Sequence, residues 1–184
     1  MSGKLHQQGI DLFRQGKYQA ALDKLNEALS ETGDDTRGAA EIYNDIGVTC
    51  KQLENYAAAH QALDEAGRHF DELADQKGQA QTLGNRAAVY EAEGLTEQAV
   101  ETYKQSATLF ETLGENEMAM YVWQAISRLR MNQKQYVAAI GAYEEGIENM
   151  PDTSLKKKIL RQILKIPGGM LGGPGKSSQQ GQDS

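Results

Sequence analysis

The chain has 184 residues, of which 39% are hydrophobic and only 3 are proline, and its formal net charge is −7. This length predicts one domain, and the modest hydrophobic content favours an elongated repeat array over a compact globule. Residues 154–184 carry six basic side chains and one acidic side chain, so residues 1–153 hold a net charge of −12. An acidic body disfavours nucleic-acid binding, because neutralising phosphates requires clustered lysine and arginine.

Sequence features that direct a chain out of the cytoplasm are missing. The single cysteine, Cys50, excludes an intrachain disulfide, which fits a reducing compartment. The first residues lack the apolar core of a signal peptide, and no apolar run reaches membrane-spanning length. We therefore expect a soluble cytoplasmic protein.

Residues 4–29 predict the first pair of helices. Apolar residues recur there at helical spacing, Gly16 interrupts them, and the pattern resumes at Tyr18. The stretch from Thr32 to Asp35 predicts the end of this pair and supplies N-cap candidates for the next helix. Three further pairs follow the same plan.

A short phrase, Tyr-x-Ala-Ala, opens the second helix of each pair. It starts at Tyr18, Tyr56 and Tyr136, and a degenerate copy starts at Thr96. The steps between successive copies are 38, 40 and 40 residues, and self-similarity at such a period indicates a stacked-repeat architecture. We interpret the phrase as packing sequence at the seam of each helical hairpin, and we expect its degenerate copy to mark the least tightly packed unit.

Small residues recur where the two helices of each pair should cross. Close approach of two helices needs glycine, alanine or serine at the contact, and overfilling such a site costs about 1–3 kcal/mol. These positions are Gly9, Gly47, Ala87 and Ser127 in the first helices and Ala21, Ala59, Ala99 and Ala139 in the second.

The order of large, small and aromatic residues over 2–151 resembles the tetratricopeptide repeat. The fourth unit shows it best, with Trp123, Ile126, Ser127, Tyr136, Ala139, Tyr143, Gly146 and Pro151. The resemblance implies an all-α fold, a right-handed α-solenoid of four helix hairpins. The steps exceed the family's usual 34 residues, so the helices or their connections should be longer, as in extended repeats of 38–40 residues. The predicted repeats span about 2–35, 40–73, 80–113 and 120–151.

Two arginines depart from the pattern of the tetratricopeptide repeat. Arg86 and Arg130 occupy positions that the family usually fills with an apolar or aromatic side chain. Either the third and fourth units open locally at these positions, or the arginines extend outward to solvent.

Residues 154–166 predict a last, basic helix with an apolar stripe that suits a cap on the fourth repeat. The Gly-, Ser- and Gln-rich residues 167–184 predict a disordered tail. We favour a solvated cap for the helix. A contact for an acidic partner or for the acidic body of another copy, and an anionic membrane surface, are the alternatives. The basic side chains concerned are Lys156, Lys157, Lys158, Arg161 and Lys165.

No residue pattern predicts catalysis, a metal site or a cofactor. A near match to a phosphate-binding loop has Met170 in place of its first glycine, and no strand precedes it and no helix follows it. Cys50 falls at an inward position with no histidine beside it. His6, His60 and His69 show no metal-ligand spacing. We therefore expect that the protein is not an enzyme.

The resemblance also implies a groove on the concave face, lined by the first helix of each pair, that receives a peptide or a helix of a partner protein. Asn85 matches a position where related repeats hold a peptide backbone, because an amide donates and accepts at once. The family's lysine and asparagine set for a C-terminal carboxylate is not reproduced. The principal groove positions are His6, Arg14, Asn44, Lys51, Gln81, Asn85, Tyr121, Gln124 and Arg128, and the others are Gln7, Ile10, Glu41, Asp45, Val48, Ala88, Glu91 and Met131.

These observations predict an all-α solenoid that acts as a protein–protein interaction scaffold. The partner's peptide or helix would lie in the concave groove. The alternative is a self-associating or anionic-membrane-surface adaptor that acts through the basic C-terminal helix.

Overall fold

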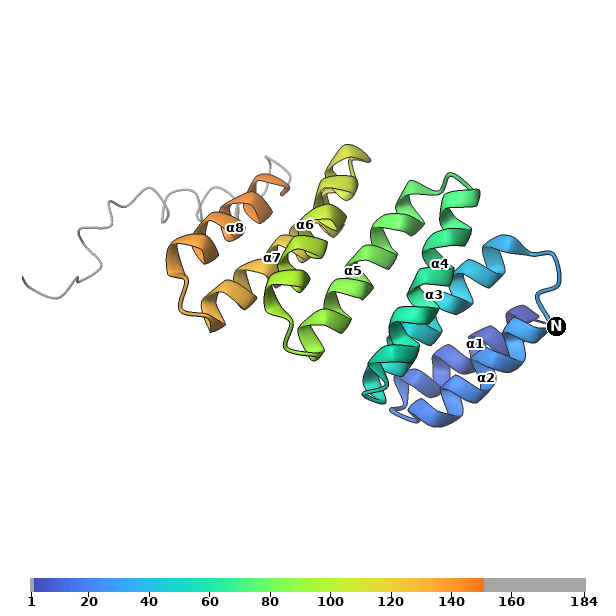
Figure 1. Ribbon diagram of the computed structural model, residues 1–184. Coiled ribbons are helices and arrows are strands. Elements are labelled where there is room, and N and C mark those ends of the chain that lie inside the picture. Colours follow the sequence, from blue (N-terminus) through green and yellow to red (C-terminus); the bar gives the residue numbers. More distant parts are fainter. Residues whose placement is uncertain (1, 151–184) are drawn as a thin grey trace, which may run out of the picture. The chain divides into compact units, whose positions relative to one another are not determined.

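The computed structural model describes residues 2–150, which form eight α-helices arranged as four successive hairpins (Figure 1). The all-α architecture is thus confirmed for this part of the chain. The predicted cap over 154–166 and tail over 167–184 lie outside the described residues. The helices are α1 (Ser2–Arg14), α2 (Tyr18–Ser30), α3 (Thr36–Gln52), α4 (Tyr56–Glu72), α5 (Gln76–Ala92), α6 (Thr96–Thr112), α7 (Asn116–Asn132) and α8 (Tyr136–Glu148).

The second helix of each hairpin begins at the residue that opens the repeated phrase, at Tyr18, Tyr56, Thr96 and Tyr136. Each helix from α3 to α7 has 17 residues. Two such helices and two three-residue turns account for the 40-residue step. The first step is shorter because α2 has only 13 residues. Longer helices, as expected, therefore explain why the period exceeds that of the tetratricopeptide repeat.

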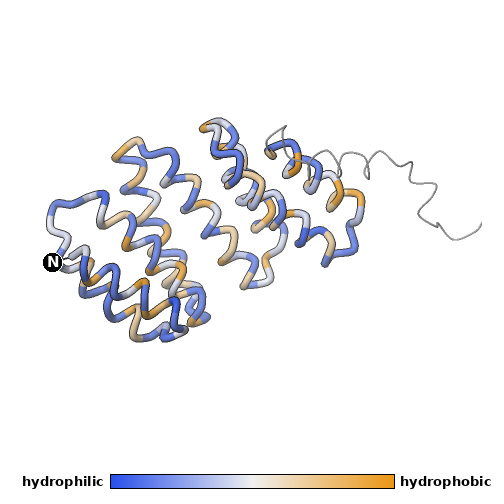
Figure 2. Tube along the Cα trace, turned by 180° about the vertical axis from the view of Figure 1, so that it is seen from behind, coloured by the Kyte–Doolittle hydropathy of each residue, from blue (hydrophilic) through white to orange (hydrophobic). Residues whose placement is uncertain are grey.

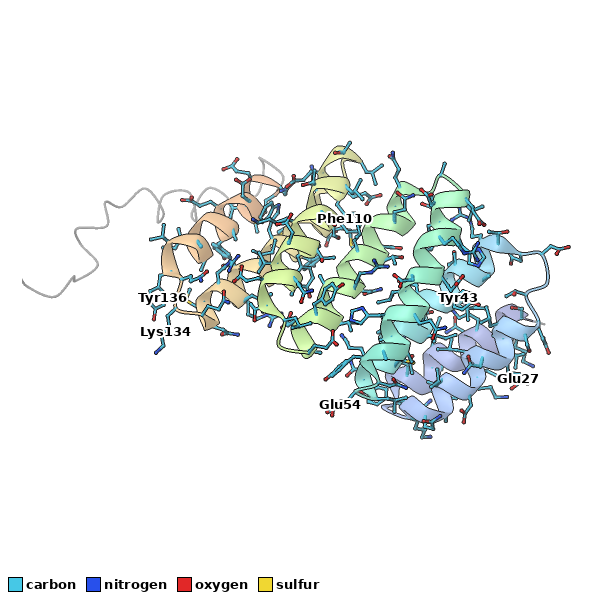
Figure 3. All side chains as sticks on the ribbon, viewed as in Figure 1. Glu27, Tyr43, Glu54, Phe110, Lys134 and Tyr136 are labelled. Carbon is cyan, nitrogen blue, oxygen red and sulfur yellow. The ribbon has the colours of Figure 1, made fainter. Side chains whose placement is uncertain are left out.

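All connections between successive helices have three residues, apart from the longer one between α2 and α3. Each three-residue turn places its middle residue in the left-handed region. In each of these turns the third residue's N–H donates to the carbonyl five residues earlier, as Lys17 does to Leu12 at 3.0 Å. This arrangement satisfies carbonyls that the helix end leaves unpaired. Figure 3 labels two of the non-glycine residues, Glu54 and Lys134, at the tips of their hairpins. The six residues are Gly16, Glu54, Ala74, Gly94, Gly114 and Lys134.

Side-chain caps start α3, α4 and α5. The Asp35 carboxylate accepts from the Gly38 N–H at 2.9 Å, so one of the predicted N-cap candidates is confirmed. Asp75 accepts from the Gly78 N–H in the same way at 2.9 Å, and this bond holds the pKa of Asp75 below its ordinary range. Such caps satisfy N–H groups that the first turn of a helix leaves unpaired.

The predicted packing seam within each hairpin is confirmed. A Cβ added at Gly47 would lie 2.6 Å from the Leu63 Cγ, so only glycine fits there. The hydroxyl of Ser127 donates to the carbonyl of Ala139 at 2.7 Å across the fourth seam. The alanines of the repeated phrase that face these positions are fully buried, namely Ala21, Ala59, Ala99 and Ala139.

The expectation that the degenerate phrase marks the loosest hairpin is wrong. Ala99 of the third hairpin is 0% exposed, like Ala59 of the second, and Val100 is 1% exposed, whereas its counterpart His60 is half-buried. The residues that differ from the phrase are Thr96, which is half-buried, and Gln98, which is exposed, whereas the seam alanine Ala99 is kept. Their replacement therefore leaves the seam unchanged.

The two unusual arginines extend outward to acids on the preceding hairpin, so neither unit opens. Arg130 makes two hydrogen bonds to the Glu97 carboxylate, at 2.6 and 2.9 Å. Arg86 makes one hydrogen bond, from its Nη2 to the Asp64 carboxylate of α4. The Nε atom of Arg86 is buried and has no hydrogen-bond partner among residues 2–150.

The largest apolar clusters divide the described residues into two halves. Figure 2 shows hydrophobic and hydrophilic residues interspersed along the helices, as expected for helices with one buried side. One cluster unites α1–α4 side chains with Val89 of α5, and the other unites α5–α8 side chains such as Val100 and Ile126. Between residues 2 and 150, no helix combines the length and apolar character needed to cross a membrane.

Polar contacts supplement the packing between α4 and α5 and their neighbours. Arg37 of α3 pairs with the carboxylate of Asp75, the N-cap of α5, at 2.6 Å. This ion pair joins the second hairpin to the third. His60 of α4 lies 2.7 Å from the Glu93 carboxylate and packs against Tyr90. The second and third hairpins are therefore held in register by directional bonds as well as by apolar contact.

Candidate partner-binding groove

A groove of about 730 Å³ crosses the first helices of the four hairpins. Its walls come from α1, α3, α5 and α7. Three aromatic side chains of the second helices also line the groove, between the first helices. A volume of this size accommodates a short peptide segment. The lining residues are His6, Ile10, Glu41, Asn44, Asp45, Phe70, Gln81, Gly84, Asn85, Ala88, Tyr103, Phe110, Met118, Tyr121, Val122 and Ala125.

The structure brings five of the nine principal groove residues together in this lining, namely His6, Asn44, Gln81, Asn85 and Tyr121. Lys51 and Arg128 line a second hollow of about 500 Å³, which shares Ala88 and Tyr103 with the groove.

Arg14 and Gln124 line neither hollow. Arg14 lies at the exposed end of α1, where its guanidinium is 3.7 Å from the Asp11 carboxylate. Gln124 is half-buried next to Trp123, and its backbone faces Gly146 of α8. Both side chains therefore belong to surfaces other than the groove.

His6 and Asp45 form an ion pair at the N-terminal end of the groove. The His6 Nε2 lies 2.7 Å from the Asp45 carboxylate, and only 16% of the His6 side chain is exposed. The hydrogen bond to Asp45 raises the pKa of His6 above its ordinary value of 6.5, against the opposing effect of burial, and the charges of Asp45 and Glu41 raise it further. Glu41 itself is exposed and makes no hydrogen bond or ion pair within residues 2–150.

Two amides meet in the middle of the groove. The Asn85 Nδ2 donates to the Asn44 Oδ1 at 3.0 Å, and the hydroxyl of Thr82 donates to the same oxygen at 3.4 Å. These contacts join α3 to α5 and fix both amides. The Nδ2 group of Asn44 and the Oδ1 of Asn85 have no hydrogen-bond partner in the described part of the chain.

Arg128 is held by an acid of the preceding hairpin. Its guanidinium makes two bonds to the Glu91 carboxylate, at 2.6 and 3.0 Å. The Tyr103 hydroxyl donates to the same carboxylate at 3.3 Å. Burial, and then the charge of Glu91, raises the pKa of Tyr103 well above its ordinary value. Arg128 thus lines the second hollow, and its charge is already paired with the carboxylate of Glu91.

Sequence reasoning missed the aromatic residues that the second helices contribute to the groove. Phe70 of α4 and Tyr103 and Phe110 of α6 are buried side chains that nevertheless border it. They line the groove because the first helices beside them carry small residues, such as Gly84 and Ala88. No signal in the sequence separates a core aromatic that borders a groove from one that does not.

The described residues give no indication of a metal or nucleophilic centre. Within residues 2–150 no three histidine, cysteine, aspartate or glutamate side chains are grouped so that they could hold a metal ion. Cys50 is buried, and burial raises the pKa of its thiol, so the reactive thiolate is disfavoured.

Comparison with solved structures shows the fold. A structure titled MamA matches with a TM-score of 0.61 at 18% identity, covering 87% of this chain and 81% of that one. BtubC from P. vanneervenii gives a TM-score of 0.66 at 14% identity, covering 96% of this chain and 84% of that one. MamA residues 41 to the end, from Desulfovibrio magneticus RS-1, give 0.60 at 16% identity, covering 81% and 75%. These likenesses support an all-α helical-repeat solenoid.

Comparison with sequences shows the family. No curated protein matches the sequence at a significant level. The family model described as soluble NSF attachment protein, SNAP, matches residues 6–165. The resemblance to the tetratricopeptide repeat therefore holds at the coarser level of a helical-repeat protein of similar type. Because the family model spans most of the sequence, the chain belongs to the soluble NSF attachment protein family.

Proposed function

We propose that the protein is a protein–protein interaction scaffold that holds a peptide or helix of its partner in the groove across α1, α3, α5 and α7. The observation that carries the proposal is the amide pair of Asn44 and Asn85, fixed at 3.0 Å in the middle of a groove of about 730 Å³. The Nδ2 group of Asn44 and the Oδ1 of Asn85 stay available for a peptide backbone. The family's name, which describes attachment to a protein, is consistent with such a role.

Preorganisation is the physical basis of this function. His6 is bonded to α3, and Asn85 is bonded to α3 from the other side. Side chains that are already ordered lose little conformational entropy when a ligand arrives, so more of the contact energy contributes to affinity. A groove whose polar groups bridge neighbouring hairpins therefore suits the capture of a flexible segment.

Blocking the groove tests the proposal. In affinity capture from the native cell extract, Ala88→Trp should remove the bound partner, because Ala88 lines the groove and the new indole would fill it. Ala57→Trp is the matched control, since Ala57 is exposed on α4 and does not line the groove. If Ala88→Trp retains the same partners at the same level as the wild type, the groove is not the binding site.

A second function is favoured by the cluster Lys156, Lys157 and Lys158, which lies outside the described residues. Each basic side chain near an anionic membrane contributes roughly 1 kcal/mol of attraction. Flotation with anionic liposomes, comparing the full chain with a variant in which these lysines are glutamate, tests that adaptor role. Light scattering on the same two proteins tests self-association.

A further inference from the structure

The lining of the groove changes its chemistry from one hairpin to the next. Residues 40 positions apart occupy the same place in successive 40-residue repeats. At the first of two such places stand Glu41, Gln81 and Tyr121, and at the second stand Asp45, Asn85 and Ala125. All six line the groove. It therefore passes from carboxylates on α3, through amides on α5, to apolar groups on α7.

The carboxylates at the α3 end are not fully neutralised by the protein. Glu41 has no ion-pair partner within residues 2–150, and His6 is the single basic side chain among the groove-lining residues. Asp45 already shares that histidine. A cationic group of a ligand would thus meet an excess of negative charge at this end.

The apolar surface at the α7 end is open to a ligand. Tyr121 is 54% exposed, and Met118, Val122 and Ala125 line the groove beside it. The Tyr121 hydroxyl is held by Glu117 at 3.3 Å, which leaves the ring to make contacts. Exposed aromatic side chains of this kind supply a large share of the binding energy in protein interfaces.

We propose that the groove binds a partner segment whose two ends differ, with a basic side chain over Glu41 and Asp45 and an apolar side chain over Tyr121. The proposal rests on the groove being the binding site. Two helix spacings separate α3 from α7, roughly 20 Å. An extended chain covers that distance in about six residues. The amides of Asn44 and Asn85 would then face the backbone in the middle of the segment.

A designed peptide of about ten residues tests the proposal on the full chain. It has two lysines at one end, two leucines at the other, a serine and glutamine spacer, and blocked termini. Its dissociation constant is measured by fluorescence anisotropy at low salt. We expect Glu41→Gln to weaken binding roughly threefold, within the range of partly exposed ion pairs. Tyr121→Ala should weaken it about tenfold or more.

Coupling between protein and peptide variants fixes the orientation. The effect of Glu41→Gln should vanish when the peptide's lysines become glutamine, and that of Tyr121→Ala should vanish when its leucines become serine. Glu101→Gln is the matched control, because Glu101 is an exposed carboxylate on α6 that does not line the groove. It should leave the dissociation constant unchanged.

Several outcomes would overturn the proposal. Equal affinity for a peptide with glutamates in place of the lysines, or equal effects of Glu41→Gln and Glu101→Gln, would remove the basic requirement. If Ala88→Trp still abolished partner capture, the groove function would stand while the ligand chemistry failed. Dissociation of a self-associated complex by the lysine peptide would assign the groove to the basic residues of another copy instead of a separate partner.

Discussion

The α4–α5 junction and the α6–α7 junction solve the same packing problem with different chemistry. Ile126 of α7 is 2% exposed and joins Val100 in a buried cluster. The residue 40 positions earlier is Arg86, which instead extends to Asp64 and leaves its Nε without a partner among the described residues. Apolar burial contributes about 25 cal/mol per Å², whereas an exposed ion pair contributes at most about 1 kcal/mol. Ile126 therefore stabilises the α6–α7 junction by apolar burial, whereas Arg86 contributes mainly orientation to the α4–α5 junction.

A similar contrast between polar and apolar contacts is found among the first helices, which carry the groove amides. At the α3–α5 contact, Asn44, Thr82 and Asn85 form a bonded group. The corresponding place on α7 has Ala125. Polar junctions are a weak source of stability, but they fix side chains that a ligand can use. The α3–α5 contact thus contributes little to stability but supplies the polar part of the groove.

The largest expected effect comes from breaking the apolar junction. Ile126→Ala should lower the free energy of unfolding by about 3 kcal/mol, because it removes a buried side chain and leaves a cavity. Hydrogen exchange should show the loss of protection concentrated in α6–α8, since each repeat contacts mainly its neighbours. Equal loss of protection in α1 and α2 would show that the two halves unfold as one unit.

The next largest effect comes from adding a side chain where α4 and α5 pack closely. A Cβ at Gly78 would lie 2.2 Å from the Phe70 ring, so Gly78→Ala should destabilise the protein by about 2 kcal/mol. Gly67→Ala is the control on the partner helix, because its Cβ would meet only Thr82 at 3.9 Å. That change should stabilise the helix by up to about 1 kcal/mol. Chemical denaturation measures both, and similar signs would contradict the packing described.

Converting the polar junction to the apolar type should have a smaller effect of opposite sign. Arg86→Ile places at the α4–α5 junction the residue found at position 126, and it removes a buried Nε that has no partner within residues 2–150. We expect a gain of about 1 kcal/mol in the free energy of unfolding. Asp64→Asn, which removes the exposed partner of the pair, should change stability by less. A loss caused by Arg86→Ile would mean that the ion pair, not apolar contact, holds this junction.

The smallest effect concerns the polar junction between α1 and α3 and depends on pH. The folded-state pKa of His6 is raised above 6.5, so its pair with Asp45 stabilises the fold below that pH. The contribution, at most about 1 kcal/mol, is lost as the pH rises through the raised pKa. The difference in melting temperature between wild type and His6→Gln should therefore be larger at pH 5.5 than at pH 9. A difference that grows with pH would contradict this assignment.

Much of the fold could be predicted because the packing of each hairpin depends on residues that are close together in the sequence. The phrase that opens at Tyr18, Tyr56, Thr96 and Tyr136 marks the first residue of each second helix, and the small residues opposite it are buried as expected. Turn geometry was harder, since Glu54, Ala74 and Lys134 adopt the left-handed conformation without glycine. The N–H groups of these turns donate to the last carbonyls of the preceding helix, and no residue preference predicts that arrangement.

The helical period, the hairpin seams and the first-helix positions that supply the groove can all be read from the order of residues. Those features depend on spacing and side-chain volume, which are properties of the chain alone. Tertiary structure decided which of those positions share one groove, which charges are already matched, and which second-helix aromatics reach it. Lys51 and Arg128 were separated from the groove, and Phe70 and Phe110 were added to its lining. These outcomes depend on how neighbouring hairpins pack, because residues about 40 positions apart meet only when the hairpins stack.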